Sequence, residues 1–215
     1  DNVANDQRTI VYRQRNELMA SDDISDLLVD MRKEVVEQLV DTFIPPQSVP
    51  EQWDIEGLEQ ALQVEFASEQ PVQAWLDADE KLYEEQIKER VLENLNQAYE
   101  EKSAAVGDKM RAFEKQITLQ ILDGLWKEHL ATMDHLRQGI FLRSYGGKNP
   151  RQEYKREAFA LFQDLMTNLQ QEVTKVLSHV RIRQDDEADA IEKQRAAELA
   201  AQKLSLQHQQ SSELS

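Results

Sequence analysis

Histidines are the side chains most able to bind a metal or transfer protons near neutral pH, so their spacing indicates whether the sequence contains such a site. The sequence contains His129, His135, His179 and His208. A metal-binding pair on a helix needs a spacing of about four residues and a carboxylate partner, whereas His129 and His135 are six residues apart. His129 also falls within an apolar series. We therefore interpret it as a hydrogen-bonded core histidine rather than as a ligand or a base.

Neighbouring carboxylates, such as Glu84-Glu85 and Glu100-Glu101, are the next candidates for acid–base chemistry. Such pairs catalyse reactions only where one environment raises a pKa relative to the other. Nothing in these stretches predicts an enclosing pocket, so we expect solvated helix faces. The chain has no cysteine, which excludes a disulfide framework, thiolate zinc ligands and cysteine nucleophiles. We expect no catalytic residue and no metal site.

The run Gly146-Gly147-Lys148 has some features of a phosphate-binding loop but lacks two that are required. Asn149 stands where a Ser or Thr is needed, and Leu142 occupies the position of the first glycine. The sequence therefore predicts no nucleotide site.

The same loop is instead the best candidate for contact with a partner. Tyr145 lies between Arg143 and Lys148, and residues 135–156 hold six Lys and Arg side chains against one acid, Glu153. An exposed tyrosine flanked by cations suits contact with a polypeptide, a membrane interface or nucleic acid. The alternative is a solvated loop whose tyrosine folds back on a helix end.

Two long helices must position this loop. One has a heptad series of seam residues: Leu119, Leu122, Trp126, His129, Met133, Leu136 and Ile140. The other has a matching apolar series: Ala158, Phe162, Leu165, Leu169, Val173, Val176 and Val180. Each arm has about 33 residues, which is roughly 50 Å of helix. The pattern predicts a long antiparallel hairpin, with Pro150 in the first turn of its second helix.

The rest of the chain also reads as helical. Its 6 glycines and 5 prolines in 215 residues are too few for an all-β fold, so we predict an all-α protein. Val3, Ile10, Val11 and Leu18 indicate a helix over residues 1–20, and a second helix runs from a cap at 21–23 to Pro45-Pro46. Residues 45–79 predict short helices around Trp53 and Trp75. A longer helix begins near Asp79 and has inward positions at Tyr83, Ile87, Val91 and Ala98.

Charge is distributed unevenly along the chain, whose net charge is −16. Residues 51–108 hold 16 acidic and 4 basic side chains, whereas residues 109–183 hold 8 acidic and 13 basic ones. This pattern places a positive hairpin within an acidic chain. Residues 184–215 are rich in Gln, Ala, Glu and Ser and predict a flexible tail. Since the chain lacks an initiator Met and opens within a helical pattern, we expect it to be part of a longer protein.

Several motifs resemble those of one family, in order and with matching spacing. They are DNVANDQR (1–8), YRQRN (12–16), IPPQ (44–47), WDI (53–55), LWKEHL (125–130), MDHLRQGI (133–140) and QEYKRE (152–157). Over residues 1–183 the chain resembles the SecA family of bacterial preprotein translocase motors. The resemblance implies that 1–20 end a long scaffold helix and 21–106 form a helical wing domain. It implies that 107–183 form the scaffold and two-helix finger, and that 184–215 begin a largely disordered C-terminal linker.

The resemblance also implies a function. The longer protein would be a protein-secreting ATPase, and this part of it would be non-catalytic and regulatory. Its hairpin would contact unfolded preproteins and the SecYEG channel through Tyr145, Arg143 and Lys148. Tyr145 corresponds to the loop tyrosine of the family, but the sequence around it, from Ser144 to Pro150, differs from that of the family, so only Tyr145 and the nearby cations are carried over. ATP with magnesium would belong to motor domains before residue 1. Zinc and the main SecB-binding surface would belong to a tail after residue 215. The location would be cytoplasmic, peripherally associated with the inner membrane.

Two other classes of function are open at this point. A stand-alone helical adaptor would bind protein partners through the wing and hairpin, and its gene would begin near residue 1. An RNA-binding hairpin would show steeply salt-dependent affinity, but the acidic residues 51–108 argue against nucleic acid as a partner.

Overall fold

The computed structural model describes residues 2–143, 146–181 and 192–201, and these residues form helices without any strand. The all-α prediction is confirmed for them. The labelled elements are α1 (Asn2–Ala20), α2 (Ser25–Phe43), the short 3-10 helix η1 (Pro50–Gln52), α3 (Ile55–Phe66), α4 (Val72–Ala78), α5 (Glu84–Val106), α6 (Lys109–Arg143) and α7 (Pro150–His179). Residues 192–201 are also helical, and the remainder of the predicted tail lies outside the described residues.

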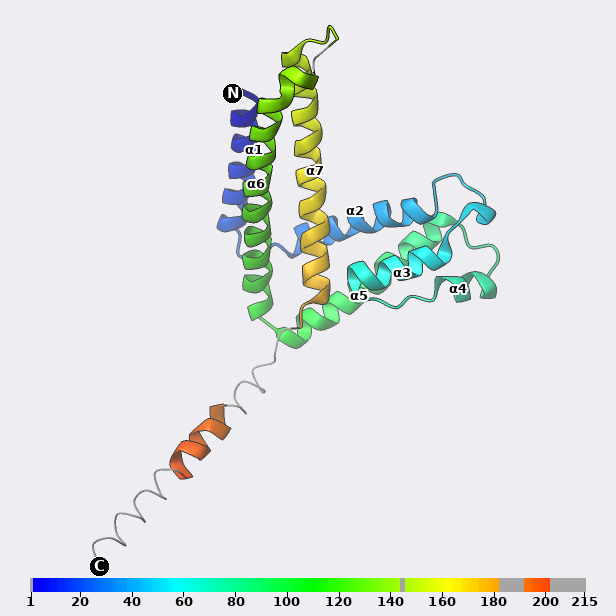
Figure 1. The fold of residues 1–215 in the computed structure, drawn as a ribbon. Coiled ribbons are helices and arrows are strands. Elements are labelled where there is room, and N and C mark those ends of the chain that lie inside the picture. The colour runs from blue at the N-terminus through cyan, green and yellow to red at the C-terminus, as the bar shows by residue number, and fades with distance from the viewer. Residues whose placement is uncertain (1, 144–145, 182–191, 202–215) are drawn as a thin grey trace, which may run out of the picture.

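Helices α6 and α7 form the predicted antiparallel hairpin, with 35 and 30 residues respectively. At 1.5 Å per residue, α6 alone is about 50 Å long. Helix α1 packs against both arms, so that three helices stand side by side (Figure 1). The hairpin is therefore braced along much of its length rather than standing alone.

The helices α2 to α5 project sideways from this three-helix unit (Figure 1), and we call these four helices the wing. The wing has its own core, which includes Val36, Val40, Leu58, Leu62, Val72, Trp75, Ile87 and Val91. Trp53 packs at its edge, and its Nε1 donates to Ser48 Oγ at 3.0 Å. The two tryptophans thus contribute to one local core.

Helix α2 belongs to both units. Its N-terminal half supplies Leu28 and Met31 to the core formed with α1, α6 and α7. Its C-terminal half supplies Val36 and Val40 to the wing core, where neither is exposed. One continuous helix therefore carries the wing on the hairpin.

Several expected inward positions are wrong. In α1, Gln7 is buried and Ile10 is 41% exposed, because Gln7 faces the junction of α6 and α7. Helix α5 begins at Glu84, not near Asp79, and Tyr83 is exposed.

Ala98 of α5 is exposed as well. Beyond Leu95 the helix leaves the wing core, and Tyr99 packs against the hairpin in its place. None of the helices in the described part is long and apolar enough to cross a membrane.

Candidate functional site

The predicted seam of the hairpin lies in the interior of the three-helix unit. Six of the seven predicted seam residues are buried: Leu122, Trp126, His129, Met133, Leu136 and Ile140. Towards the N-terminus of α6, before Leu122, the buried positions are Thr118 and Glu114, while Leu119 is only partly buried. In this part of α6, successive buried positions are four residues apart, whereas the heptad pattern alternates spacings of three and four. The buried face consequently rotates away from the heptad position of Leu119.

His129 links all three long helices. Its Nε2 lies 2.7 Å from Oε1 of Gln7 in α1, and Nε2 of Gln7 donates to the carbonyl of Ala158 in α7 at 3.0 Å. Because the Gln7 amide nitrogen is committed to Ala158, its oxygen accepts from His129, which places the imidazole hydrogen on Nε2. The ring of His129 stacks on Trp126 with centroids 5.4 Å apart.

Burial lowers the pKa of His129, which favours the neutral ring. The geometry is that of a hydrogen-bonded core histidine. Within residues 2–143, 146–181 and 192–201, no group of three or more His, Asp or Glu side chains is placed to hold a metal.

The turn of the hairpin separates Arg143, the last residue of α6, from Pro150, the first of α7. Gly146 and Gly147 have φ angles of 108° and 94°, which residues other than glycine rarely adopt. Lys148 is exposed. Tyr145 and the side chain of Arg143 lie outside the described residues, so their contacts stay a prediction.

The turn does not have the arrangement of a phosphate-binding loop. Such a loop joins a strand to a free helix N-terminus, and the described residues contain no strand. The N-terminus of α7 is also occupied, because Oδ1 of Asn149 accepts a hydrogen bond from the backbone of Arg151 at 3.0 Å.

Two apolar side chains next to the turn were missed by the sequence reasoning. Phe141 and Leu142 are 75% and 81% exposed at the end of α6. Side chains of this size are seldom exposed as neighbours unless a partner covers them. The available signal was their position, since both lie off the seam beside Ile140.

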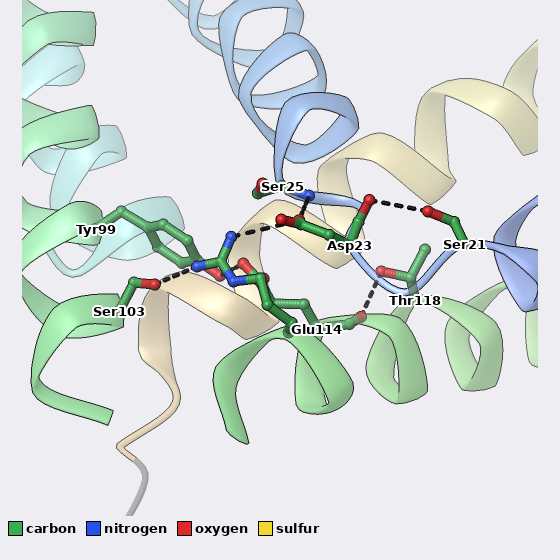
Figure 2. Close-up of polar contacts among 8 residues, drawn as sticks. Ser21, Asp23, Ser25, Tyr99, Ser103, Glu114 and Thr118 are labelled. Atoms are coloured by element: carbon green, nitrogen blue, oxygen red, sulfur yellow. Dashed lines mark hydrogen bonds and ion pairs between the residues drawn. The ribbon is translucent and has the colours of Figure 1, made fainter. Parts of the chain in front are cut away.

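A second polar cluster lies at the opposite end of the hairpin, where the wing joins it (Figure 2). The hydroxyl of Tyr99 in α5 donates to Oε2 of Glu114 in α6 at 2.6 Å. Nε of Arg111 lies 3.2 Å from Oε1 of the same carboxylate. Arg111 also lies 3.7 Å from Asp23 in the loop between α1 and α2, and it donates to Ser103. We call Asp23, Tyr99, Ser103, Arg111 and Glu114 the joint cluster.

The joint cluster is partly removed from water. Glu114 is fully buried, and this burial raises its pKa against the opposing effects of Tyr99 and Arg111. The pKa of Tyr99 is raised as well, first by burial and then by the neighbouring Glu114. Sequence reasoning missed this cluster because its members come from three segments. The only local signal was the four-residue step from Glu114 to Thr118 to Leu122.

Helix α5 of the wing also contacts the C-terminal end of α7. Nζ of Lys102 in α5 donates to the carbonyls of Leu177 and Ser178 at 3.0 and 2.8 Å. A cation is favourable there, because the C-terminal end of a helix carries a partial negative charge. The wing thus holds both ends of the hairpin base.

These features define an all-α protein with a long braced hairpin that is joined at its base to a helical wing through a polar cluster. A family model described as the SecA Wing and Scaffold domain matches residues 1–181. The chain therefore belongs to the SecA family.

Its relatives include proteins named "Protein translocase subunit SecA" from three species. The one from Ectopseudomonas mendocina is 50% identical over all of this chain and 24% of its own length. The one from Stutzerimonas stutzeri has the same identity and coverage. One from Pseudomonas putida is 50% identical over 97% of this chain and 23% of its own length. The chain spans about a quarter of the length of these relatives.

Proposed function

We propose that this chain is the non-catalytic wing and scaffold part of an ATP-driven protein translocase, and that its hairpin tip acts on the polypeptide being moved. The names of the relatives support the general role. The observation that carries the specific role is the hairpin itself. An arm of about 50 Å, braced by α1, places Phe141 and Leu142 far from the wing and largely exposed.

The tip chemistry suits an unfolded chain of variable sequence. Aromatic and aliphatic side chains contact many unrelated peptide segments, because they need shape and apolar area rather than a fixed hydrogen-bond pattern. Tyr145 follows Phe141 and Leu142 within a few residues and would add a flat ring, and Lys148 would add an exposed cation. Exposed charges contribute little each, so we assign the main role to the apolar side chains.

In this proposal ATP with magnesium binds elsewhere in a longer protein, and the joint cluster transmits the motion of those parts to the hairpin. The tip would work at the mouth of the SecYEG channel. The protein would be cytoplasmic and peripherally bound to the inner membrane. Zinc and the main SecB-binding surface would lie outside the chain described here.

The test is Tyr145→Ala in the longer protein, with Tyr83→Ala as a matched control. Tyr83 is a 55% exposed tyrosine on the wing. We expect Tyr145→Ala to lower preprotein transport into membrane vesicles strongly while basal ATP hydrolysis stays nearly unchanged, and Tyr145→Phe to retain more transport. Equal transport rates for Tyr145→Ala and Tyr83→Ala at limiting protein would contradict the proposal.

A further inference from the structure

Arg32 is a buried cation whose close partners are neutral. It lies in α2 and is 5% exposed. Its Nη1 donates to Oδ1 of Asn96 at 2.8 Å, and its guanidinium lies 4.2 Å from the centre of the Tyr99 ring. None of the ion pairs within the described part of the chain includes Arg32.

This arrangement is unusual because an arginine keeps its charge in a protein, and a charge removed from water normally has an opposite charge beside it. The carboxylates of Glu114 and Glu100 act on Arg32 only from beyond ion-pair distance. They do not offset its burial, which lowers the pKa of Arg32. The carboxylate of Glu114 is already shared by Tyr99 and Arg111.

Arg32 also lines a pocket of about 420 Å³ between α2, α5 and the start of α6. Ser25 and Val29 of α2, Ser103 of α5 and Arg111 of α6 form further parts of its wall. Arg111 donates to Ser103 and pairs with Asp23 and Glu114, so Arg32 is the guanidinium in this wall that has no ion pair among the described residues. The joint cluster and this pocket share Tyr99, Ser103 and Arg111.

We propose that this pocket binds one carboxylate group, with Arg32 as its counter-charge. A guanidinium matches a planar carboxylate with two parallel hydrogen bonds. Asp26 and Glu100 also line the pocket, and their negative charge disfavours a phosphate, which carries nearly two charges. The proposal is independent of the hairpin tip and of the translocase role.

The first test uses the 215-residue chain at pH 7 and titrates sodium acetate against sodium chloride at constant ionic strength. The Nε–H resonances of the arginines are followed by NMR. We expect the resonance of Arg32 to shift and saturate with a dissociation constant on the order of 10 mM, typical of one charge-assisted contact. Phosphate should bind at least several-fold more weakly. A response to phosphate equal to or stronger than that to acetate would overturn the assignment.

Arg90→Gln is the matched control, because the Arg90 guanidinium lies 4.2 Å from the Trp75 ring in an exposed part of the wing. Acetate binding, followed in the variants through the backbone resonance of Ser103, should disappear in Arg32→Gln and persist in Arg90→Gln. Equal responses of both variants would refute a site at Arg32.

A second variant keeps Arg32 and supplies the carboxylate from within the chain. Val29 lines the pocket one turn before Arg32 and is 44% exposed. Val29→Glu should raise the midpoint of thermal unfolding by about 2 °C or more relative to Val29→Gln, and it should abolish the acetate response. If Val29→Glu is no more stable than Val29→Gln, Arg32 does not need a carboxylate and the proposal is wrong.

The source of the carboxylate is tested with N-acetylglutamate N-methylamide, which presents one side-chain carboxylate on a peptide backbone. Binding at least as tight as that of acetate supports a protein segment. Binding of acetate without binding of this compound would assign the site to a small free carboxylate rather than to a protein side chain.

Discussion

The hydroxyl of Tyr99 donates to the carboxylate of Glu114 at 2.6 Å, and this contact joins the last helix of the wing to the first helix of the hairpin. The two helices are consecutive in the chain, but Gly107 between them has a φ of 80° and breaks the helical path. The angle between wing and hairpin therefore depends on side chains, chiefly the joint cluster and the shared core of α2.

Replacing Glu114 should loosen this joint. Glu114→Ala leaves the Tyr99 hydroxyl without its acceptor and removes the buried carboxylate that pairs with Arg111, so we expect a loss of about 2–4 kcal/mol in the free energy of unfolding. Glu114→Gln keeps an acceptor for Tyr99 and should cost clearly less. Urea unfolding of the two variants measures the difference.

A double-mutant cycle with Tyr99→Phe supplies the control for this prediction. We expect a coupling energy between positions 99 and 114 of about 0.5–3 kcal/mol. Additive effects of the two substitutions would mean that the contact does not hold the joint.

The stability of the chain should depend on the protonation of His129. Since burial lowers its pKa in the folded state, the unfolded state binds a proton more readily. The contribution of His129 is then complete above the unfolded pKa of about 6.5 and is lost as the pH falls through the lowered folded pKa.

The measurement compares the pH dependence of the unfolding free energy between about pH 7.5 and 5. His129→Gln should flatten this dependence, whereas His135→Gln, at an exposed position of the same helix, should preserve it. The opposite result, with a flattened profile only for His135→Gln, would show that burial of His129 is not the cause.

Trp126→Ala should destabilise the hairpin by about 3–5 kcal/mol, because it removes a large buried side chain. Trp126 is 8% exposed and contacts the rings of Tyr12 and His129. Hydrogen exchange should accelerate mainly in α1, α6 and α7. Trp75→Ala, an equally buried position in the wing core, should accelerate exchange mainly in α2 to α5. Identical patterns for the two variants would contradict two separately packed cores.

The sequence by itself determined the long hairpin. Heptad spacing from Leu122 to Ile140 and the break at Gly146-Gly147 are local features, and local spacing fixes which face of a long helix is apolar. The family was also readable from the sequence, because short motifs such as LWKEHL and MDHLRQGI carry it without any knowledge of the fold.

Only the tertiary structure decided which polar residues are interior. Gln7, Arg32 and Glu114 carry no local sign of burial, yet each is less than a tenth exposed. Their partners lie 151, 64 and 15 residues away along the chain. Periodicity describes one helix at a time, and it contains no information on which other helix covers a face. The joint cluster and the Arg32 pocket exist because α2, α5 and α6 converge there, and that convergence is set by packing across the whole fold.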